Sequence, residues 1–211
     1  MKNLIYALTA ACLLSWGCQP EPDAAKLIDD MVVSTNYDPE ADFDGYLTYA
    51  IPTDTIGYIS NTSNDTILVS PKSDFPRHVL TAIRQNLDAR GYTRVAREED
   101  PDVGINVLVV NDFNVFQEIV YPGYYGYPGN YYPGYWGYGS YYYYPYINTY
   151  AYNTGVLIIE MVDLKNRTPD NKVKVVWDAY IGDLYSTIDR LPTSARAIDQ
   201  AFFQSPYLDK Q

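Results

Sequence analysis

The sequence predicts an α+β domain whose mostly antiparallel sheet has about four or five strands, with two helices packed on one face. Apolar residues at period two over 103–110 predict a buried strand, and the apolar run 155–163 predicts a central one. The alternating stretch 172–179 predicts an antiparallel hairpin with that central strand. Apolar residues at helical spacing predict one helix over 74–90 and another over 194–203.

The N-terminal residues have the pattern of an export signal. Leu4 to Trp16 is apolar, too short to span a bilayer and typical in length of a signal-peptide core. It leads into Gly17 and Cys18, and a small residue directly before a cysteine resembles the lipobox of bacterial lipoproteins. The resemblance implies cleavage before Cys18 and acylation of its thiol, with palmitate as the expected fatty acid. An ordinary secretory signal with an incidental cysteine is the alternative.

Three segments follow from this interpretation: a signal peptide over 1–17, a polar tether over 18–30, and a single domain over 31–208. The chain has two cysteines, and Cys12 lies in the predicted signal peptide. Cys18 is therefore the only cysteine of the mature chain, which excludes a disulfide or a cysteine metal cluster there. The formal net charge of −11 argues against nucleic acid or an anionic membrane surface as the main partner.

The first part of the domain contains two short strand patterns and the first helix. Stretches 31–36 and 46–51 are rich in β-prone residues. The stretch 53–73 is rich in Thr, Ser, Asn and Asp, and we predict a loop there with room for a hairpin through 67–69. Asp74 is the expected N-cap of the helix that follows.

The second part of the domain continues the sheet and ends in a helix. In 172–179, apolar residues alternate with two lysines and an aspartate, and this alternation predicts a half-exposed strand. Thr193 is the expected cap of the second helix, and Ser205 followed by Pro206 is expected to end it.

The most unusual stretch is the tyrosine-rich insertion, Tyr121–Tyr152. It holds 15 tyrosines, 6 glycines and 4 prolines in 32 residues and carries no charge. Strand patterns lie on both sides, so we predict an insertion between two neighbouring strands. Tyrosine rings have apolar faces and a polar tip, and they lose little side-chain entropy on binding. The insertion is therefore either a surface loop whose rings stack on each other and on the sheet edge, or a binding surface. The candidate binding residues are Tyr124, Tyr125, Tyr127, Tyr131, Tyr132, Tyr135, Trp136 and Tyr138.

Several short motifs occur together in the domain. They are the segment 36–50 (NYDPEADFDGYLTYA), Gly91–Tyr92, Pro101–Val103, Gly155–Ile159 with Asp163, Trp177, and 198–203. Together they resemble domain-of-unknown-function family 4136, over about residues 31 to 208. The resemblance implies an envelope lipoprotein without an established activity, and it brings no catalytic residue to this chain.

The acidic cluster in the first motif invites a calcium interpretation. Asp38, Glu40, Asp42 and Asp44 have the spacing of loop ligands, but Ile51 occupies the position where such a loop needs a bidentate glutamate. The family resemblance implies turn-forming aspartates instead. We predict a structural turn and no metal site, with a weak cation site as the alternative.

The sequence has little that indicates catalysis. His78 is the only histidine and lies near a helix start, and there is no Gly-x-Ser-x-Gly motif, phosphate loop or dinucleotide fingerprint. We therefore predict no cofactor and no enzymatic activity. The expected function is that of a lipid-anchored envelope lipoprotein, in the outer membrane, that binds another envelope protein or a glycan. The alternative is a polysaccharide hydrolase with a carboxylate pair and tyrosine sugar platforms.

Overall fold

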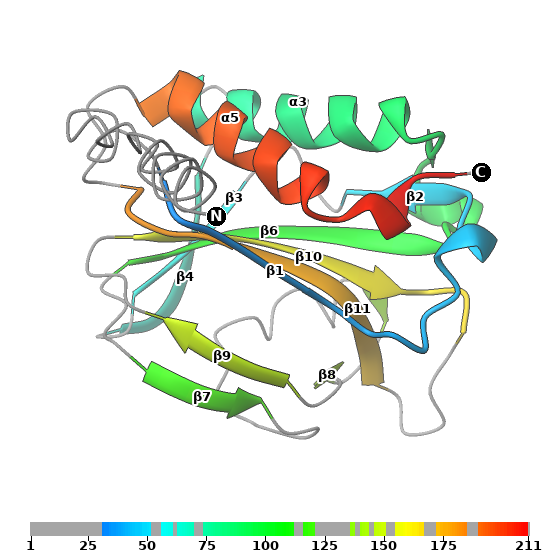
Figure 1. Ribbon diagram of the computed structural model, residues 1–211, viewed down its shortest axis with the longest axis horizontal. Helices are drawn as coiled ribbons and strands as arrows, with labels where there is room; N and C mark the ends of the chain where they lie inside the picture. The colour runs from blue at the N-terminus through cyan, green and yellow to red at the C-terminus, as the bar shows by residue number, and fades with distance from the viewer. Residues whose placement is uncertain are drawn as a thin grey trace, which may run out of the picture.

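A computed structural model of the chain describes residues 31–51, 56–60, 63–69, 74–111, 116–120, 136–137, 140–143, 146–150, 155–166, 172–184 and 190–210. These residues form three layers: two helices, a large sheet, and a two-stranded ribbon on the opposite side of the sheet (Figure 1). Within the described part of the chain, no helix is long and apolar enough to cross a membrane.

The large sheet has nine strands among the described residues. They are β1 (Val33–Tyr37), β2 (Thr48–Ala50), β3 (Ile56–Ser60), β4 (Ser63–Val69), β5 (Thr93–Arg94), β6 (Val103–Asn111), β8 (Ser140–Tyr143), β10 (Val156–Asp163) and β11 (Lys172–Ile181). The separate ribbon pairs β7 (Phe116–Val120) antiparallel with β9 (Tyr146–Tyr150).

The centre of the sheet is the antiparallel series β1-β11-β10-β6. On the outer side of β6, both β2 and β3 run parallel to it, and β8 runs parallel to β11 at the other edge. The predicted antiparallel pairing of the central strands is confirmed, but the sheet as a whole is mixed and has more strands than the four or five predicted. The additional strands come from stretches dominated by turn-forming residues or tyrosine, where alternation is weak: 56–69 provides the β3–β4 hairpin and 140–143 provides β8.

The insertion follows β7 directly and lies in the chain between β6 and β10. Strands β6 and β10 are antiparallel neighbours with Val110 opposite Val156. The insertion therefore leaves and re-enters the sheet at one end. It contributes β8 to the large sheet and β9 to the ribbon.

Strand β10 is central and all eight of its residues are buried, as its apolar run predicts. Strand β11 is also buried on both faces over most of its length, so the prediction of a half-exposed strand is wrong. The register between the two strands shifts at Met161 and Val162, so that Trp177 faces Met161 but Val175 faces Val162. This irregularity places Val175 and Trp177 on opposite faces of the sheet, and the sequence alternation does not reveal it.

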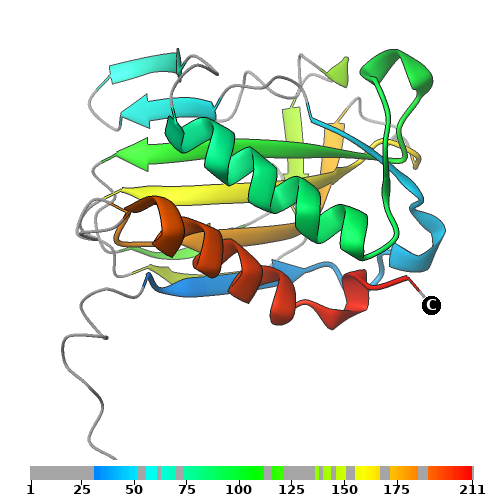
Figure 2. The ribbon, with the colours of Figure 1, turned by 90° about the horizontal axis from the view of Figure 1, so that it is seen from above.

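Helices α3 (Asp74–Ala89) and α5 (Arg190–Phe203) cover the same face of the sheet, as predicted (Figure 2). Residues at helical spacing bury one side of each: Val79, Leu80, Ile83 and Leu87 in α3, and Ala197, Ile198, Ala201 and Phe202 in α5. Helix α3 ends before Gly91, whose φ of +87° suits glycine. Helix α5 begins four residues earlier than predicted, so Thr193 is buried inside it rather than capping it.

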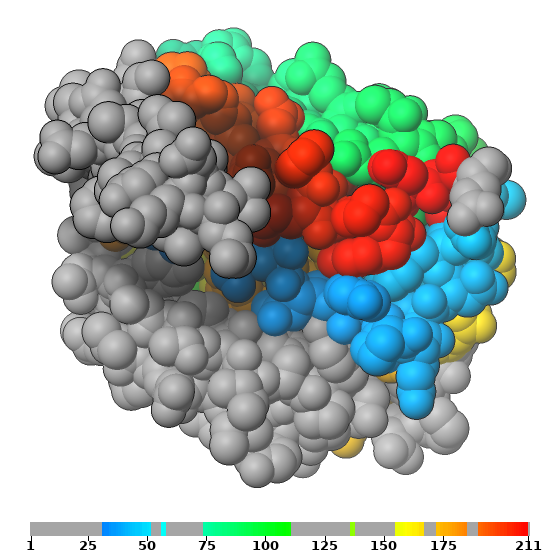
Figure 3. Space-filling view, in the orientation of Figure 1, coloured from blue at the N-terminus to red at the C-terminus, as the bar shows by residue number. Residues whose placement is uncertain are grey.

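The two ends of the domain pack together. Tyr37 at the end of β1 stacks on Tyr207 of the 3₁₀ turn η3 (Pro206–Leu208), with ring centroids 4.0 Å apart. Figure 3 shows the N-terminal part of the domain, in blue, lying against the C-terminal part, in red. Behind it, the Trp177 indole N–H donates to Ser205 Oγ at 2.9 Å. The first motif is thus fixed against the C-terminal segment.

Both faces of the central strands are buried. One face packs into the main core under the helices through Ile105, Val107, Ile159 and Trp177. Residues that alternate with these, such as Ile158, are equally buried on the face that lies toward the β7–β9 ribbon. This second face carries the polar features described next.

Candidate functional site

The tyrosine-rich insertion is tied to the second face of the sheet by Trp136. Its side chain is only 8% exposed and lies against Gly104 of β6. A Cβ atom at position 104 would lie 2.5 Å from Trp136 Cζ2 and 2.6 Å from Cε2, so only glycine leaves room for the ring. The sequence predicts Trp136 as part of a binding surface, whereas the structure buries it between insertion and sheet.

A row of buried polar side chains crosses four strands beside this contact. Trp136 Nε1 donates to Asn106 Oδ1 at 3.0 Å, and Asn106 Nδ2 donates to Glu160 Oε2 at 3.1 Å. On the far side of the row, Asn36 Nδ2 donates to Asp178 Oδ1 at 2.8 Å. The strand register places Asn106 opposite Glu160, Glu160 opposite Asp178, and Asp178 opposite Asn36. The row therefore links the insertion to the central strands.

The row contains a pair of carboxylates, Glu160 and Asp178, both 0% exposed. Burying two neighbouring carboxylates costs free energy if both are ionised. Such a pair therefore needs hydrogen bonds from surrounding groups. A glycoside hydrolase also uses two carboxylates, but a sugar and a water molecule must reach them. In this structure the pair is enclosed by the sheet and what packs on it.

An open hollow of about 480 Å³ lies at the edge of the Trp136 contact. Described residues that line it include two cations, two carboxylates and three apolar side chains. They are Arg97, Asp100, Pro101, Asp102, Trp136, Leu164 and Lys165. The hollow lies where β6 begins and β10 ends, next to the 3₁₀ turn at Arg97–Glu99.

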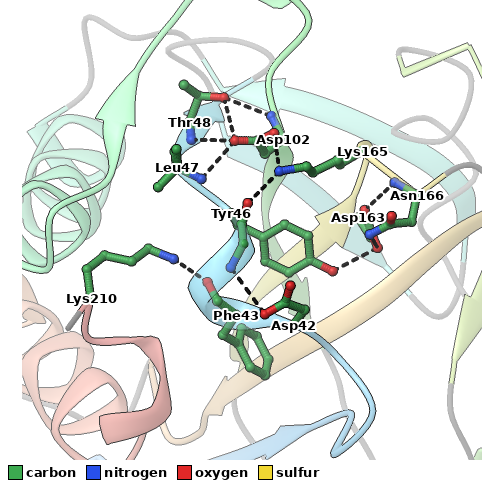
Figure 4. A network of polar contacts seen from close by, with 11 residues as sticks. Asp42, Phe43, Tyr46, Leu47, Thr48, Asp102, Asp163, Lys165, Asn166 and Lys210 are labelled. Carbon is green, nitrogen blue, oxygen red and sulfur yellow. Dashed lines mark hydrogen bonds and ion pairs between the residues drawn. The ribbon is translucent and has the colours of Figure 1, made fainter.

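Asp102 forms one wall of the hollow and ties β2 to β6 (Figure 4). Its Oδ2 accepts hydrogen bonds from the backbone N–H groups of Leu47 at 2.8 Å and Thr48 at 2.9 Å, and from the Thr48 hydroxyl at 3.1 Å. Burial acts to raise the pKa of Asp102, but these bonds and the Lys165 ammonium together lower it below its ordinary value. Asp102 is therefore an ionised, structurally engaged carboxylate at neutral pH.

Lys165 and Tyr46 hold the opposite side of this network (Figure 4). Lys165 Nζ lies 3.5 Å from Asp102 Oδ1 and donates to the Gly45 carbonyl at 2.6 Å. The Tyr46 hydroxyl donates to Asp163 Oδ2 at 2.7 Å. Burial, and then the bond to Asp163, raise the pKa of the Tyr46 phenol far above its ordinary range, so it stays protonated and acts as a donor.

The acidic cluster of the first motif forms turns, as the resemblance implies. Asp42 Oδ1 accepts from the Gly45 N–H at 3.2 Å and caps the 3₁₀ turn η1 (Phe43–Gly45). Asp38 Oδ1 accepts from the Glu40 N–H at 2.9 Å, and its other oxygen pairs with Lys174. Across the described residues, no group of three or more His, Cys, Asp or Glu side chains is arranged to hold a metal ion.

The single histidine also has a local role. His78 is exposed, and its Nδ1 lies 2.9 Å from the Asp74 carbonyl oxygen in the first turn of α3. The 3₁₀ turn η2 (Arg97–Glu99) beside the hollow is closed by a bond from the Ala96 N–H to Glu99 Oε2 at 2.7 Å. These contacts are structural, and they leave the hollow and the insertion as the features that packing alone does not explain.

A family model described as "Domain of unknown function (DUF4136)" matches residues 33–207, from the first strand to the last 3₁₀ turn. The chain belongs to the DUF4136 family. The motifs that carry the family resemblance are those just described. Asp42 and Asp102 shape turns and hold β2, Tyr46 and Asp163 bond to each other, and Trp177 joins the sheet to the C-terminus.

One solved structure agrees with this membership, and two others are more distant. A DUF4136 family protein from Bacteroides thetaiotaomicron is 34% identical, with a TM-score of 0.71, over 87% of this chain and 100% of that chain. A PelC dodecamer from Paraburkholderia phytofirmans is 14% identical, with a TM-score of 0.39, over 86% and 99% of the two chains. A PDZ domain protein from Parabacteroides distasonis is 14% identical, with a TM-score of 0.37, over 87% and 39%. A comparison with curated proteins found no match.

The remaining sequence-predicted site residues of this DUF4136 protein lie outside the described residues. They are Cys18, Tyr124, Tyr125, Tyr127, Tyr131, Tyr132, Tyr135 and Tyr138. Sequence reasoning missed Gly104, Asn106, Glu160 and Asp178 as the support of the insertion. The signal that could have found them is a glycine or polar residue between apolar neighbours inside a strand. A buried polar side chain costs free energy unless it is hydrogen-bonded, so such a residue indicates a specific partner.

Proposed function

We propose that this DUF4136 protein is a lipoprotein of the bacterial cell envelope, anchored in the outer membrane by lipid on Cys18. In this proposal the domain is a non-enzymatic binding or structural module. The tyrosine-rich insertion is its contact surface toward another envelope protein or a glycan. The apolar run that leads into Cys18 supports the anchor, as does the family resemblance.

The observation that supports the binding role is the packing of Trp136 against Gly104. An uncharged stretch of 32 residues is held on the sheet by a buried ring, by a hydrogen bond to Asn106 and by strand β8. A spacer loop needs none of these supports. Tyrosines presented from a fixed base bind at a low entropic cost, because fewer side-chain and backbone freedoms are lost on contact.

The polar contacts of the domain support a role without catalysis. Of five described carboxylates near the insertion, Asp102 and Asp163 bond to protein groups and Glu160 and Asp178 are fully buried, while Asp100 is exposed at the hollow. A general acid or base must reach its substrate. The hydrolase alternative gains no specific support from this arrangement.

The contact surface is tested by pull-down from detergent-solubilised envelopes. Deleting the whole insertion would remove Trp136 and β8 and so disturb the sheet, which makes point substitutions the better choice. We expect a variant with Tyr124, Tyr125 and Tyr127 changed to serine to lose bound envelope components. Phe203→Ser is the matched control, because it removes a 78% exposed aromatic ring from a different surface. An identical partner list for both variants and the wild type would reject the insertion as the contact surface.

The anchor is tested by metabolic labelling with a clickable palmitate analogue. We expect label on the wild type and none on Cys18→Ala, which should leave the membrane fraction. Cys12→Ala is the control, because it removes the other cysteine of the chain but leaves Cys18 in place. A Cys18→Ala protein that still carries label or stays membrane-bound would overturn lipid anchoring at this residue.

A further inference from the structure

We propose that the hollow beside Trp136 is a binding site for an uncharged carbohydrate. This proposal names a ligand class and rests on the binding function proposed above. The volume of about 480 Å³ falls within the range of about 300–1,000 Å³ that is typical of small-molecule sites. The hollow also borders Trp136 of the insertion, so a ligand there would contact both this residue and the ends of β6 and β10.

The charge of the lining favours a neutral ligand. Arg97 and Lys165 are balanced by Asp100 and Asp102, so the described lining has no net charge. A phosphate or carboxylate ligand would meet two aspartates, and a cationic ligand would meet two cations. Sugar hydroxyls both donate and accept hydrogen bonds, so they can use the cations as donors and the carboxylates as acceptors.

The apolar part of the lining suits the C–H groups of a sugar ring. It consists of Trp136, Pro101 and Leu164. The polar N–H of the Trp136 indole is already used, because it donates to Asn106. Trp136 is only 8% exposed, so a small carbon surface of its ring borders the hollow, and this surface can contact the C–H groups of a sugar.

The walls are held in place without a ligand. Asp102 is fixed by three hydrogen bonds from β2, and Lys165 by its bond to the Gly45 carbonyl. Asp100 sits in the left-handed region at φ 51°, directly after the 3₁₀ turn that carries Arg97. A pre-formed site loses less entropy on binding than one that must order itself.

Calorimetric titration of the mature, full-length protein tests the proposal. The protein is purified from membranes in a detergent without a sugar headgroup, which would otherwise compete. The probes are uncharged trisaccharides of glucose, mannose and N-acetylglucosamine, with trigalacturonic acid and dialanine as anionic and zwitterionic comparisons. We expect at least one uncharged trisaccharide to bind, and both comparison probes to bind at least tenfold more weakly or not at all.

Variants at the rim assign the binding to the hollow. Arg97→Ala and Asp100→Asn change exposed residues of the lining, and the asparagine tolerates the left-handed conformation. Each should weaken trisaccharide binding about tenfold or more, because each removes a charge-assisted hydrogen bond. Arg94→Ala, on β5 and outside the described lining, is the matched control and should leave binding unchanged.

The proposal would be overturned by no binding of any uncharged trisaccharide, or by binding that Arg97→Ala and Asp100→Asn leave unchanged. Preferential binding of dialanine would replace the carbohydrate with a zwitterionic ligand and also reject it. These outcomes are separable from the proposed function. If the tyrosine variant loses its envelope partner in the pull-down while no sugar binds, the contact surface stands and only the carbohydrate site fails.

Discussion

Gly104→Ala should displace Trp136 and loosen the insertion from the sheet. The added methyl group would lie 2.5 Å from Trp136 Cζ2 and 2.9 Å from Val162 Cγ2. Neither neighbour can yield easily, because the indole is rigid and its N–H is held by Asn106 at 3.0 Å, while Val162 belongs to a buried strand. The ring must therefore shift, and the hydrogen bond to Asn106 must stretch or break.

The expected cost follows from these two effects. Overpacking of a buried site costs about 1–3 kcal/mol, and the loss of a buried hydrogen bond costs about 1 kcal/mol or more. We expect the free energy of unfolding to fall by about 2–4 kcal/mol. With a urea m-value of about 2 kcal/mol/M, the unfolding midpoint should fall by about 1–2 M.

Urea denaturation followed by tryptophan fluorescence measures this effect, and the native spectrum should shift to longer wavelength as Trp136 meets water. A double-mutant cycle with Trp136→Ala isolates the contact. When the ring is absent, Gly104→Ala should cost much less, because only the Val162 contact remains. Equal costs with and without the Trp136 ring would refute the reasoning, since the methyl group would then act through some other contact.

Three further predictions concern the contacts that hold the domain. Tyr46→Phe removes the 2.7 Å hydrogen bond to Asp163 and should lower the free energy of unfolding by about 1.5–3 kcal/mol at pH 7; an unchanged urea midpoint would contradict it. The folded-state pKa of Asp102 is lowered, so its stabilising contribution is present above the unfolded value and is lost as pH falls through the folded value. The stability difference between wild type and Asp102→Asn should therefore shrink below about pH 4, and a constant difference would count against this assignment. Trp177→Phe loses the 2.9 Å bond to Ser205 and should cost about 1–2 kcal/mol in urea denaturation, whereas a fully neutral substitution would show that the bond contributes nothing.

The elements with strong periodicity could be predicted from the sequence. Strand β10 and helix α3 have uninterrupted patterns, and the structure places both where those patterns indicate. The insertion could also be located, because its flanking strands β6 and β10 are regular and pair with each other. Long apolar patterns are the strongest local signal of secondary structure, so the elements that they predict form in the folded domain.

The polar row could not be predicted, because it depends on strand register. Asn106, Glu160 and Asp178 each have an apolar residue directly before and after them in their strands, and nothing local indicates that they meet. The irregularity between Met161 and Val162 is equally hidden, yet without it β11 would present its residues to the wrong faces. Strands β3 and β8 were missed for a related reason: their sequences contain turn formers or tyrosine, and pairing with β6 and β11 overrides those preferences.

The polar row and the insertion explain each other physically. A cover of aliphatic residues over Asn106 would supply no hydrogen-bond donor to its Oδ1, and buried polar groups lose free energy when a partner is taken away. The Trp136 indole supplies that donor, and its flat ring fills the space left by Gly104. The sheet is thus selective for the segment that covers it. It follows that the candidate binding tyrosines, which lie outside β8 and β9, can change in number or order without loss of the fold, provided that Trp136 stays. The binding surface can then vary independently of the scaffold that holds it.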